Sequence, residues 1–97
     1  MAFEIIWSPQ AEKGLDKVLE YLQEEWSANE ILSLEKKIIV FVERISKYPT
    51  IYPPSGRHPN LRKGRVDKYN YMIYRIRRRK KTIEIINFRG LKQKPLS

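Results

Sequence analysis

The sequence contains no cysteine and only one histidine, His58. Without cysteine the chain can form neither disulfide bonds nor thiolate metal sites. A single histidine also excludes the common zinc sites that are built from two or three imidazoles. The four glycines are dispersed, so the sequence has no glycine-rich phosphate loop. We therefore expect a protein that works without a metal or another cofactor.

Long apolar segments are also missing. No run approaches the roughly 20 residues that a helix needs to cross a bilayer. The first residues lack the basic and long apolar stretches of a signal peptide. These features predict a cytoplasmic protein with no membrane partner. We also expect no small-molecule substrate. At 97 residues the chain is expected to form a single domain, residues 1–97, around one modest core.

Positively charged residues are abundant, and most of them lie in the second half of the chain. Residues 1–48 hold six Lys/Arg and nine Asp/Glu, a net charge of −3. Residues 49–97 hold fourteen Lys/Arg and two Asp/Glu, a net charge of +12. Like charges repel, so this concentration works against the stability of a small domain. A sequence that keeps it is expected to present a basic surface to nucleic acid or to an acidic protein.

Two amphipathic helices are predicted in the first half. Ser8 followed by Pro9 marks a helix start, because the serine accepts from free N–H groups and proline lacks the donor that would be unsatisfied there. The Ser-x-x-Glu of residues 27–30 is a capping box that opens a second helix, which ends before Pro49. Both helices carry apolar stripes at spacings of three and four: Ala11, Leu15, Val18, Leu19, Leu22 and Trp26, then Ile31, Leu34, Ile38, Phe41, Val42 and Ile45. The short connection predicts an antiparallel helical hairpin.

Short segments rich in β-branched and aromatic residues predict strands. They lie at residues 3–7, 61–66, 69–77 and 82–88. Residues 49–60 hold four prolines and are expected to form a loop. The order β-α-α-β-β-β predicts an α+β fold, in which the helical hairpin packs on one face of a small, mainly antiparallel sheet.

Alternation within the strands predicts which side chains face the helices. In residues 69–77 it places Tyr69, Tyr71, Ile73 and Arg75 on one face and Asn70, Met72, Tyr74 and Ile76 on the other. In residues 82–88 it places Ile83 and Ile85 on one face and Glu84, Ile86 and Phe88 on the other. Trp7 and Trp26 are expected in the core.

The basic strands are the candidate binding surface. Arginine and lysine pair with phosphates, and tyrosines such as Tyr69, Tyr71 and Tyr74 can stack on bases or pack against a partner. The candidate residues for binding a target or nucleic acid are Arg62, Lys63, Arg65, Lys68, Tyr69, Arg75, Arg89 and Lys92. By contrast, the run at residues 78–81 is interpreted as a solvated hairpin tip. His58 is interpreted as a surface residue of the proline-rich loop.

Read together, the segments of this sequence resemble the RelE/ParE superfamily of toxins from bacterial type II toxin–antitoxin modules. The resemblance rests on the order and spacing of six segments over essentially the whole chain. They are Ile6-Trp7-Ser8-Pro9-Gln10-Ala11-Glu12, Tyr48-Pro49, Leu61-Arg62-Lys63, Tyr69-Asn70-Tyr71-Met72-Ile73-Tyr74-Arg75-Ile76, Ile83-Glu84-Ile85-Ile86 and Lys92-Gln93-Lys94-Pro95. It implies the fold derived above, growth inhibition as a plasmid-stabilisation-type toxin, and an acidic antitoxin partner.

The resemblance leaves two mechanisms open. ParE-like members inhibit DNA gyrase by binding it, whereas RelE-like members are metal-independent endoribonucleases that cut messenger RNA on the ribosome. If the chain is RelE-like, the catalytic residues implied are Arg62, Arg65, Tyr71 and Lys92. However, Tyr71 stands where RelE-like ribonucleases carry an arginine, and no tyrosine follows Lys92. We therefore favour ParE-like binding of gyrase. A non-toxic nucleic-acid-binding module is a third reading of the same basic sheet.

Overall fold

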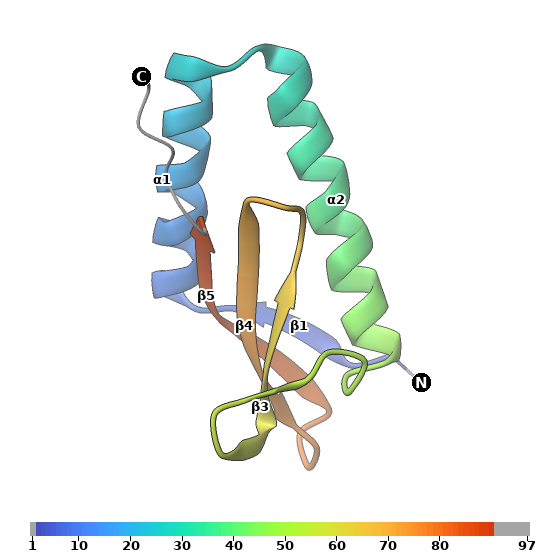
Figure 1. Ribbon diagram of the computed structural model, residues 1–97. Helices are drawn as coiled ribbons and strands as arrows, with labels where there is room; N and C mark the ends of the chain where they lie inside the picture. The colour runs from blue at the N-terminus through green and yellow to red at the C-terminus, as the bar shows by residue number, and fades with distance from the viewer. Residues whose placement is uncertain (1, 91–97) are drawn as a thin grey trace.

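The computed structural model describes residues 2–90 of the chain, which form two helices packed against one sheet (Figure 1). The elements within these residues are β1 (Glu4–Trp7), α1 (Pro9–Glu25), α2 (Ala28–Lys47), β2 (Pro54–Ser55), β3 (His58–Arg65), β4 (Asn70–Arg77) and β5 (Thr82–Gly90). The five strands of this region lie in the order β1-β5-β4-β3-β2. β1 runs parallel to β5, and the other neighbours are antiparallel. The predicted α+β architecture is confirmed.

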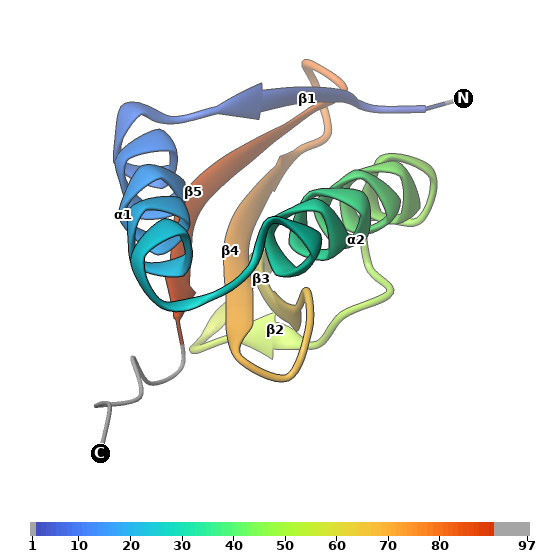
Figure 2. The ribbon, with the colours of Figure 1, turned by 90° about the horizontal axis from the view of Figure 1, so that it is seen from above.

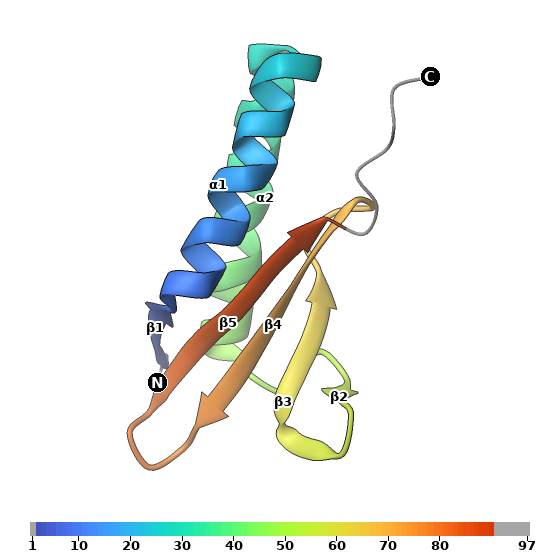
Figure 3. The same cartoon turned by 90° about the vertical axis from the view of Figure 1, so that its left-hand side faces the viewer.

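The helix starts are those that the sequence predicts. Ser8 Oγ accepts from the N–H of Ala11 at 3.0 Å and donates to the carbonyl of Ile86 at 2.9 Å, so the cap also ties α1 to β5. Ser27 Oγ accepts from the N–H of Glu30 at 3.4 Å and caps α2. The helices run in opposite directions, with α1 beside β5 (Figure 2). Both lie on the same face of the sheet (Figure 3).

The core lies between this helical layer and the inner face of the sheet. Its buried side chains come from both helices, β4 and β5: Ala11, Val18, Leu34, Ile38, Phe41, Ile45, Met72, Tyr74, Ile76, Ile83, Ile85 and Phe88. In β4 the buried residues are Asn70, Met72, Tyr74 and Ile76, as the alternation predicts. Trp7 packs against this core, which confirms its predicted position.

Phe88 lies on the inner face, and the prediction that it faces away from Ile83 and Ile85 is wrong. The cause is an irregularity in the pairing of β4 with β5. Ile73 pairs with Asn87 while its neighbour Tyr74 pairs with Ile85, so Ile86 is an extra residue in β5. An extra residue shifts the alternation by one position. Beyond it, Phe88 pairs with the buried Met72, and Arg89 turns to the outer face.

The proline-rich segment is more ordered than a plain loop. It contains β2, which the sequence did not predict, and β3 begins at His58 instead of residue 61. The ring of Tyr52 stacks on Phe41, with 4.8 Å between ring centres, and covers Gly64. The hydroxyl of Tyr74 donates to the carbonyl of Pro49 at 2.6 Å. These contacts attach the segment to the core at two points.

Trp26 is 40% exposed, so its predicted place in the core is wrong. It is the residue that caps the C-terminal end of α1, beyond the part of the helix that the sheet covers. Its ring lies 6.3 Å from that of Tyr69 in the β3–β4 connection, at an interplanar angle of 53°. The two aromatic residues therefore form a surface contact between the helical hairpin and the sheet.

Candidate functional site

The outer face of the sheet is free of helices in the region that the structure describes (Figure 3). Strand register identifies the side chains on it, because residues directly opposite each other in an antiparallel pair share a face. Three rows cross β3, β4 and β5: Arg65–Tyr71–Arg89, Lys63–Ile73–Asn87 and Leu61–Arg75–Glu84. We call these nine residues the open face.

Tyr71 lies at the centre of the cations on the open face. Its register partners are Arg65 on β3 and Arg89 on β5. The Nζ atom of Lys63 lies 4.4 Å from the centre of its ring, within the range of a cation–π contact. Three positive side chains therefore surround one half-buried phenol. This arrangement can bind an anionic group and pack an aromatic ring against the same partner.

Negative charge does little to neutralise the open face. Glu84 lies opposite Arg75, but its Oε1 accepts from the Nη2 of Arg77 at 2.9 Å. Arg75 makes no side-chain hydrogen bond or ion pair within residues 2–90 and is exposed. The sheet thus presents cations whose charge is available to a partner.

Arg62 does not lie with these cations. Its register partner is the buried Tyr74, so it belongs to the inner face of the sheet. Its guanidinium donates to the carbonyl of Pro59 at 2.7 Å and to the carbonyl of Tyr52 at 2.9 Å. The expected position of Arg62 on a free basic surface is therefore wrong, because its donors hold the proline-rich segment. Tyr74 is fully buried and cannot stack on a base either.

Burial also affects the chemistry of Tyr74. Removal of water from its hydroxyl raises the pKa of Tyr74 to about 12, and the nearby charge of Arg62 partly opposes this effect. The phenol is consequently neutral over the physiological range, and it serves as a donor to Pro49. Its role is structural.

Lys68 and Tyr69 lie in the β3–β4 connection, outside the open face. Oδ1 of Asp67 accepts from the backbone N–H groups of Tyr69 and Asn70, both at 2.8 Å, and from the side-chain amide of Asn70 at 3.0 Å. Lys68 Nζ lies 5.4 Å from the centre of the Tyr69 ring. Lys68 and Tyr69 therefore lie on the same surface as Trp26 and not on the surface that contains Tyr71. Lys92 lies outside the described residues.

A groove between α2 and this connection contains functional candidates that the sequence reasoning missed. It has a volume of about 510 Å³ and is lined by Lys36, Lys37, Val40, Phe41, Arg44, Arg65, Val66, Asp67 and Lys68. We call it the α2 groove. Lys36, Val40 and Arg44 follow one another at intervals of four residues, so the helical period alone places them on one face of α2. What the period cannot show is that the β3–β4 connection lies beside that face.

The described residues offer no obvious metal site. Residues 2–90 contain no group of three or more histidine, cysteine, aspartate or glutamate side chains positioned to share a metal ion. In the same range, neither helix has the length and apolar character that crossing a bilayer requires.

The sequence matches a known protein family. Residues 5–95 match the family described as the ParE toxin of type II toxin-antitoxin systems, parDE. No curated protein has a sequence that matches this chain.

Solved structures with the same fold come from toxin–antitoxin complexes and from an isolated toxin. The Mycobacterium tuberculosis RelBE2 toxin-antitoxin complex contains a chain with 17% identity and a TM-score of 0.63, covering 93% of this chain and 99% of that one. The isolated Escherichia coli RelE toxin has 15% identity and a TM-score of 0.62, covering 96% and 88%. A chain of the intact E. coli RelBE complex has 16% identity and a TM-score of 0.60, covering 95% and 100%. At these identities the similarity establishes the fold.

Proposed function

The chain belongs to the ParE toxin family of type II toxin–antitoxin systems, and from this membership we propose that it inhibits DNA gyrase by binding it through the open face. The observation that carries this proposal is the cluster of Lys63, Arg65 and Arg89 around Tyr71. Such a cluster can dock on an acidic surface of a protein, with the aromatic ring as an anchor.

Binding explains the open face better than bond cleavage does. To cleave RNA through its 2′-hydroxyl, an enzyme needs a group that takes up the hydroxyl proton. The register partners of Tyr71 are both arginines, and Glu84, two residue pairs away, is already ion-paired with Arg77. Around Tyr71 the described surface offers cations for a phosphate but neither a carboxylate nor an imidazole to accept a proton.

The RelE-like ribonuclease is the second candidate, and one observation favours it. Arg65, Arg89 and Lys63 approach Tyr71 from three directions, which is a suitable arrangement for stabilising the negative charge of a phosphorane. In that mechanism Tyr71 would itself exchange the proton, and Lys92 would supply a further cation. Arg62 would take no part, because its donors are committed to Pro59 and Tyr52.

The cognate antitoxin is proposed to occupy the α2 groove with an acidic segment. The groove has an apolar side chain, Val40, that is 50% exposed, and it is bordered by five cations: Lys36, Lys37, Arg44, Arg65 and Lys68. Its one carboxylate, Asp67, already accepts three hydrogen bonds within the β3–β4 connection. The similar solved structures include toxins in complex with antitoxins. Because Arg65 borders both surfaces, a bound antitoxin would cover part of the open face.

A gyrase assay with the full chain tests the proposal. Purified protein is added to gyrase and relaxed plasmid, and supercoiling is followed on gels. We expect inhibition by the wild type and its loss in the double variant Lys63→Glu/Arg65→Glu. The matched control is Lys13→Glu/Lys17→Glu, which reverses two charges on α1 and should inhibit normally. Unimpaired supercoiling, together with cleavage of messenger RNA in primer extension, would instead establish the ribonuclease mechanism.

A further inference from the structure

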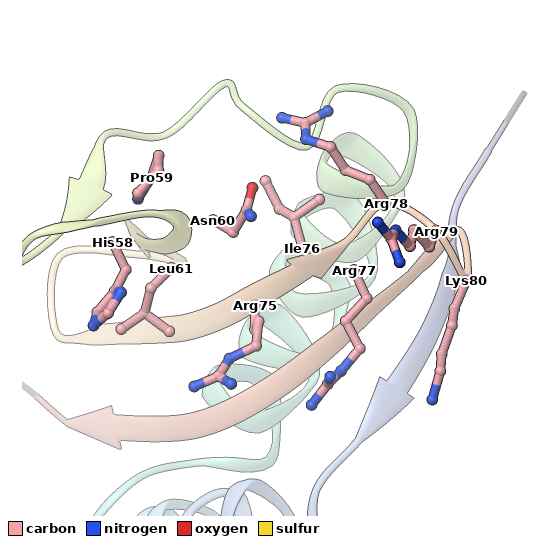
Figure 4. A pocket seen from close by; sticks show the side chains of 10 residues that line it. All are labelled: His58, Pro59, Asn60, Leu61, Arg75, Ile76, Arg77, Arg78, Arg79 and Lys80. Atoms are coloured by element: carbon pink, nitrogen blue, oxygen red, sulfur yellow. The ribbon is translucent and has the colours of Figure 1, made fainter.

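β3 and β4 separate at one end of the sheet and leave a cleft. Their pairing stops at Leu61 and Arg75, and the residues of β3 that precede Leu61 have only β2 beside them, with Ser55 opposite His58. β4 continues to Arg77, paired only with β5. The cleft has a volume of about 610 Å³ (Figure 4). We call it the turn cleft; it is lined by His58, Pro59, Asn60, Leu61, Arg75, Ile76, Arg77, Arg78, Arg79 and Lys80.

The lining of the turn cleft is strongly cationic. It includes four arginines, one lysine and one histidine, and it contains no carboxylate. Of the four arginines and the lysine, Arg77 is the one that forms an ion pair within residues 2–90, with Glu84 at 2.9 Å. Within the described part of the chain, Arg75, Arg78, Arg79 and Lys80 make no side-chain hydrogen bond or ion pair. Cations held together without partners repel one another, and a concave wall concentrates their field on whatever enters.

The geometry suits an extended polyanion. In Figure 4 the side chains of His58, Arg75, Arg77 and Lys80 extend from the same side of the ribbons. Arg75 and Arg77 are two residues apart on β4, a separation of about 6.7 Å along a strand. Successive phosphates of an extended nucleic-acid strand are spaced similarly. One strand could therefore contact both arginines in turn and reach Lys80 at the β4–β5 connection.

The lining also contains a feature that suits a nucleic acid better than an acidic peptide. Arginine outnumbers lysine, and its planar guanidinium pairs through two hydrogen bonds with a phosphate, as it does with a carboxylate. His58 adds an exposed imidazole on which an unpaired base can stack. The cleft is open, and besides His58 and the cations the described lining holds one polar side chain, Asn60, so it lacks the enclosing polar groups that fix a small free phosphate ligand.

We propose that the turn cleft binds the phosphodiester backbone of single-stranded nucleic acid. This site is centred away from the cluster around Tyr71, since Arg77 is six residues from Tyr71 along β4, about 20 Å away. Its lining shares Leu61 and Arg75 with the edge of the open face. The proposal does not depend on gyrase as the target. Gyrase binds DNA and the ribosome binds messenger RNA, so a protein that binds either target comes close to nucleic acid. It gives residues 77–80 and His58 a role in binding.

Fluorescence anisotropy with the full chain tests the proposal. The probes are labelled oligo(dT) and oligo(U), which share a backbone chemistry and distinguish DNA from RNA. The cleft variant is Arg75→Ala/Lys80→Ala, which removes two of the cations that the strand would contact, and the control Lys13→Ala/Lys17→Ala removes the same net charge from α1. We expect the cleft variant to lose about tenfold in affinity or more near 0.1 M salt, with a salt slope lower by about 1.4 for its two lost contacts. The control should change affinity much less.

Several outcomes would overturn the proposal. Equal losses in both double variants would mean that only net charge matters. Binding of labelled oligoglutamate as tightly as the oligonucleotides, with the same loss in the cleft variant, would identify a site for acidic protein. Absence of binding by the wild type would also refute it. Circular dichroism verifies folding, and His58→Ala provides a second variant, which should weaken oligonucleotide binding but leave oligoglutamate binding unchanged.

Discussion

Arg62 of β3 lies directly opposite Tyr74 of β4 on the helix-covered face of the sheet. Both side chains donate to backbone carbonyls of the proline-rich segment: Arg62 to Pro59 and Tyr52, and Tyr74 to Pro49. These two polar side chains thus hold the proline-rich segment to the sheet, in addition to the stacking of Tyr52 on Phe41. Of the lysine and arginine side chains of β3, Arg62 therefore has a structural role, whereas Lys63 and Arg65 face outward.

The first prediction concerns stability. Arg62→Ala removes the donors to two carbonyls, and we expect it to lower the free energy of unfolding by about 1–2 kcal/mol, since hydrogen bonds from a charged group are worth more than neutral ones. Urea unfolding monitored by circular dichroism measures the change. Arg65→Ala is the control, because Arg65 is exposed and makes no side-chain hydrogen bond in the described region. An equal loss in both variants would contradict the structural role of Arg62.

The second prediction concerns toxicity. Lys63→Glu/Arg65→Glu reverses the charge beside Tyr71, and we expect cells that express the variant to grow at rates close to those of uninduced cells. The fold should persist, because both side chains are exposed. Growth curves, together with immunoblots for protein level, measure the effect. Full toxicity at normal protein levels would show that the open face does not act on the target.

The helices and the central strand could be predicted from sequence because their signals are local. Ser8 and Pro9 fix the start of α1 without reference to the rest of the fold. The faces of β4 were predicted from alternation within its own residues, and its burial has the same period of two from Asn70 to Arg77.

The faces of Arg62 and Phe88 could not be predicted, because they depend on pairing between strands. The inward position of Arg62 follows from the register that the β3–β4 connection sets, through a hydrogen-bond pattern around Asp67. Phe88 changes face because of the extra residue Ile86, for which the sequence carries no glycine or other marker. The turn cleft depends on the point where the pairing of β3 with β4 ends, at Leu61 and Arg75, which local sequence patterns do not indicate.

The third prediction concerns the antitoxin. Val40→Asp places a negative charge among the apolar side chains of the α2 groove, and Lys37→Glu reverses one of its cations. Each variant should weaken antitoxin binding by about tenfold or more, because an acidic partner would meet a like charge. Isothermal titration with the co-expressed antitoxin measures the affinity. Leu32→Asp is the control, since Leu32 is exposed on α2 but is not part of the groove.

The fourth prediction concerns the core. Ile38 of α2 is 8% exposed, so Ile38→Ala leaves a cavity between the helix and the sheet. We expect a loss of about 2–5 kcal/mol in the free energy of unfolding, a large part of the stability of a domain this size. Chemical denaturation measures it. Ile39→Ala at the neighbouring exposed position is the control, and a loss well under 1 kcal/mol at Ile38 would mean that the face of α2 is misassigned.

The last prediction concerns alkaline pH. Burial raises the pKa of Tyr74 from 10.0 to about 12, because the ionised phenolate would lose its hydration. Between these two values the unfolded chain releases a proton that the folded chain retains. Fewer protons on the unfolded state mean that the free energy of unfolding falls as pH rises. The contribution of Tyr74 is therefore complete below pH 10.0 and is lost as the pH approaches and passes about 12.

Tyr74→Phe isolates this contribution. Near pH 8 the variant should be less stable than the wild type, because the carbonyl of Pro49 loses its donor. Above pH 10 the difference should shrink, since phenylalanine has no proton to release. Urea unfolding at several pH values measures both effects, and Tyr69→Phe at an exposed position controls for general alkaline destabilisation. A difference between Tyr74→Phe and the wild type that stays constant from pH 9 to pH 12 would contradict the burial of an ionisable hydroxyl at this point of the core.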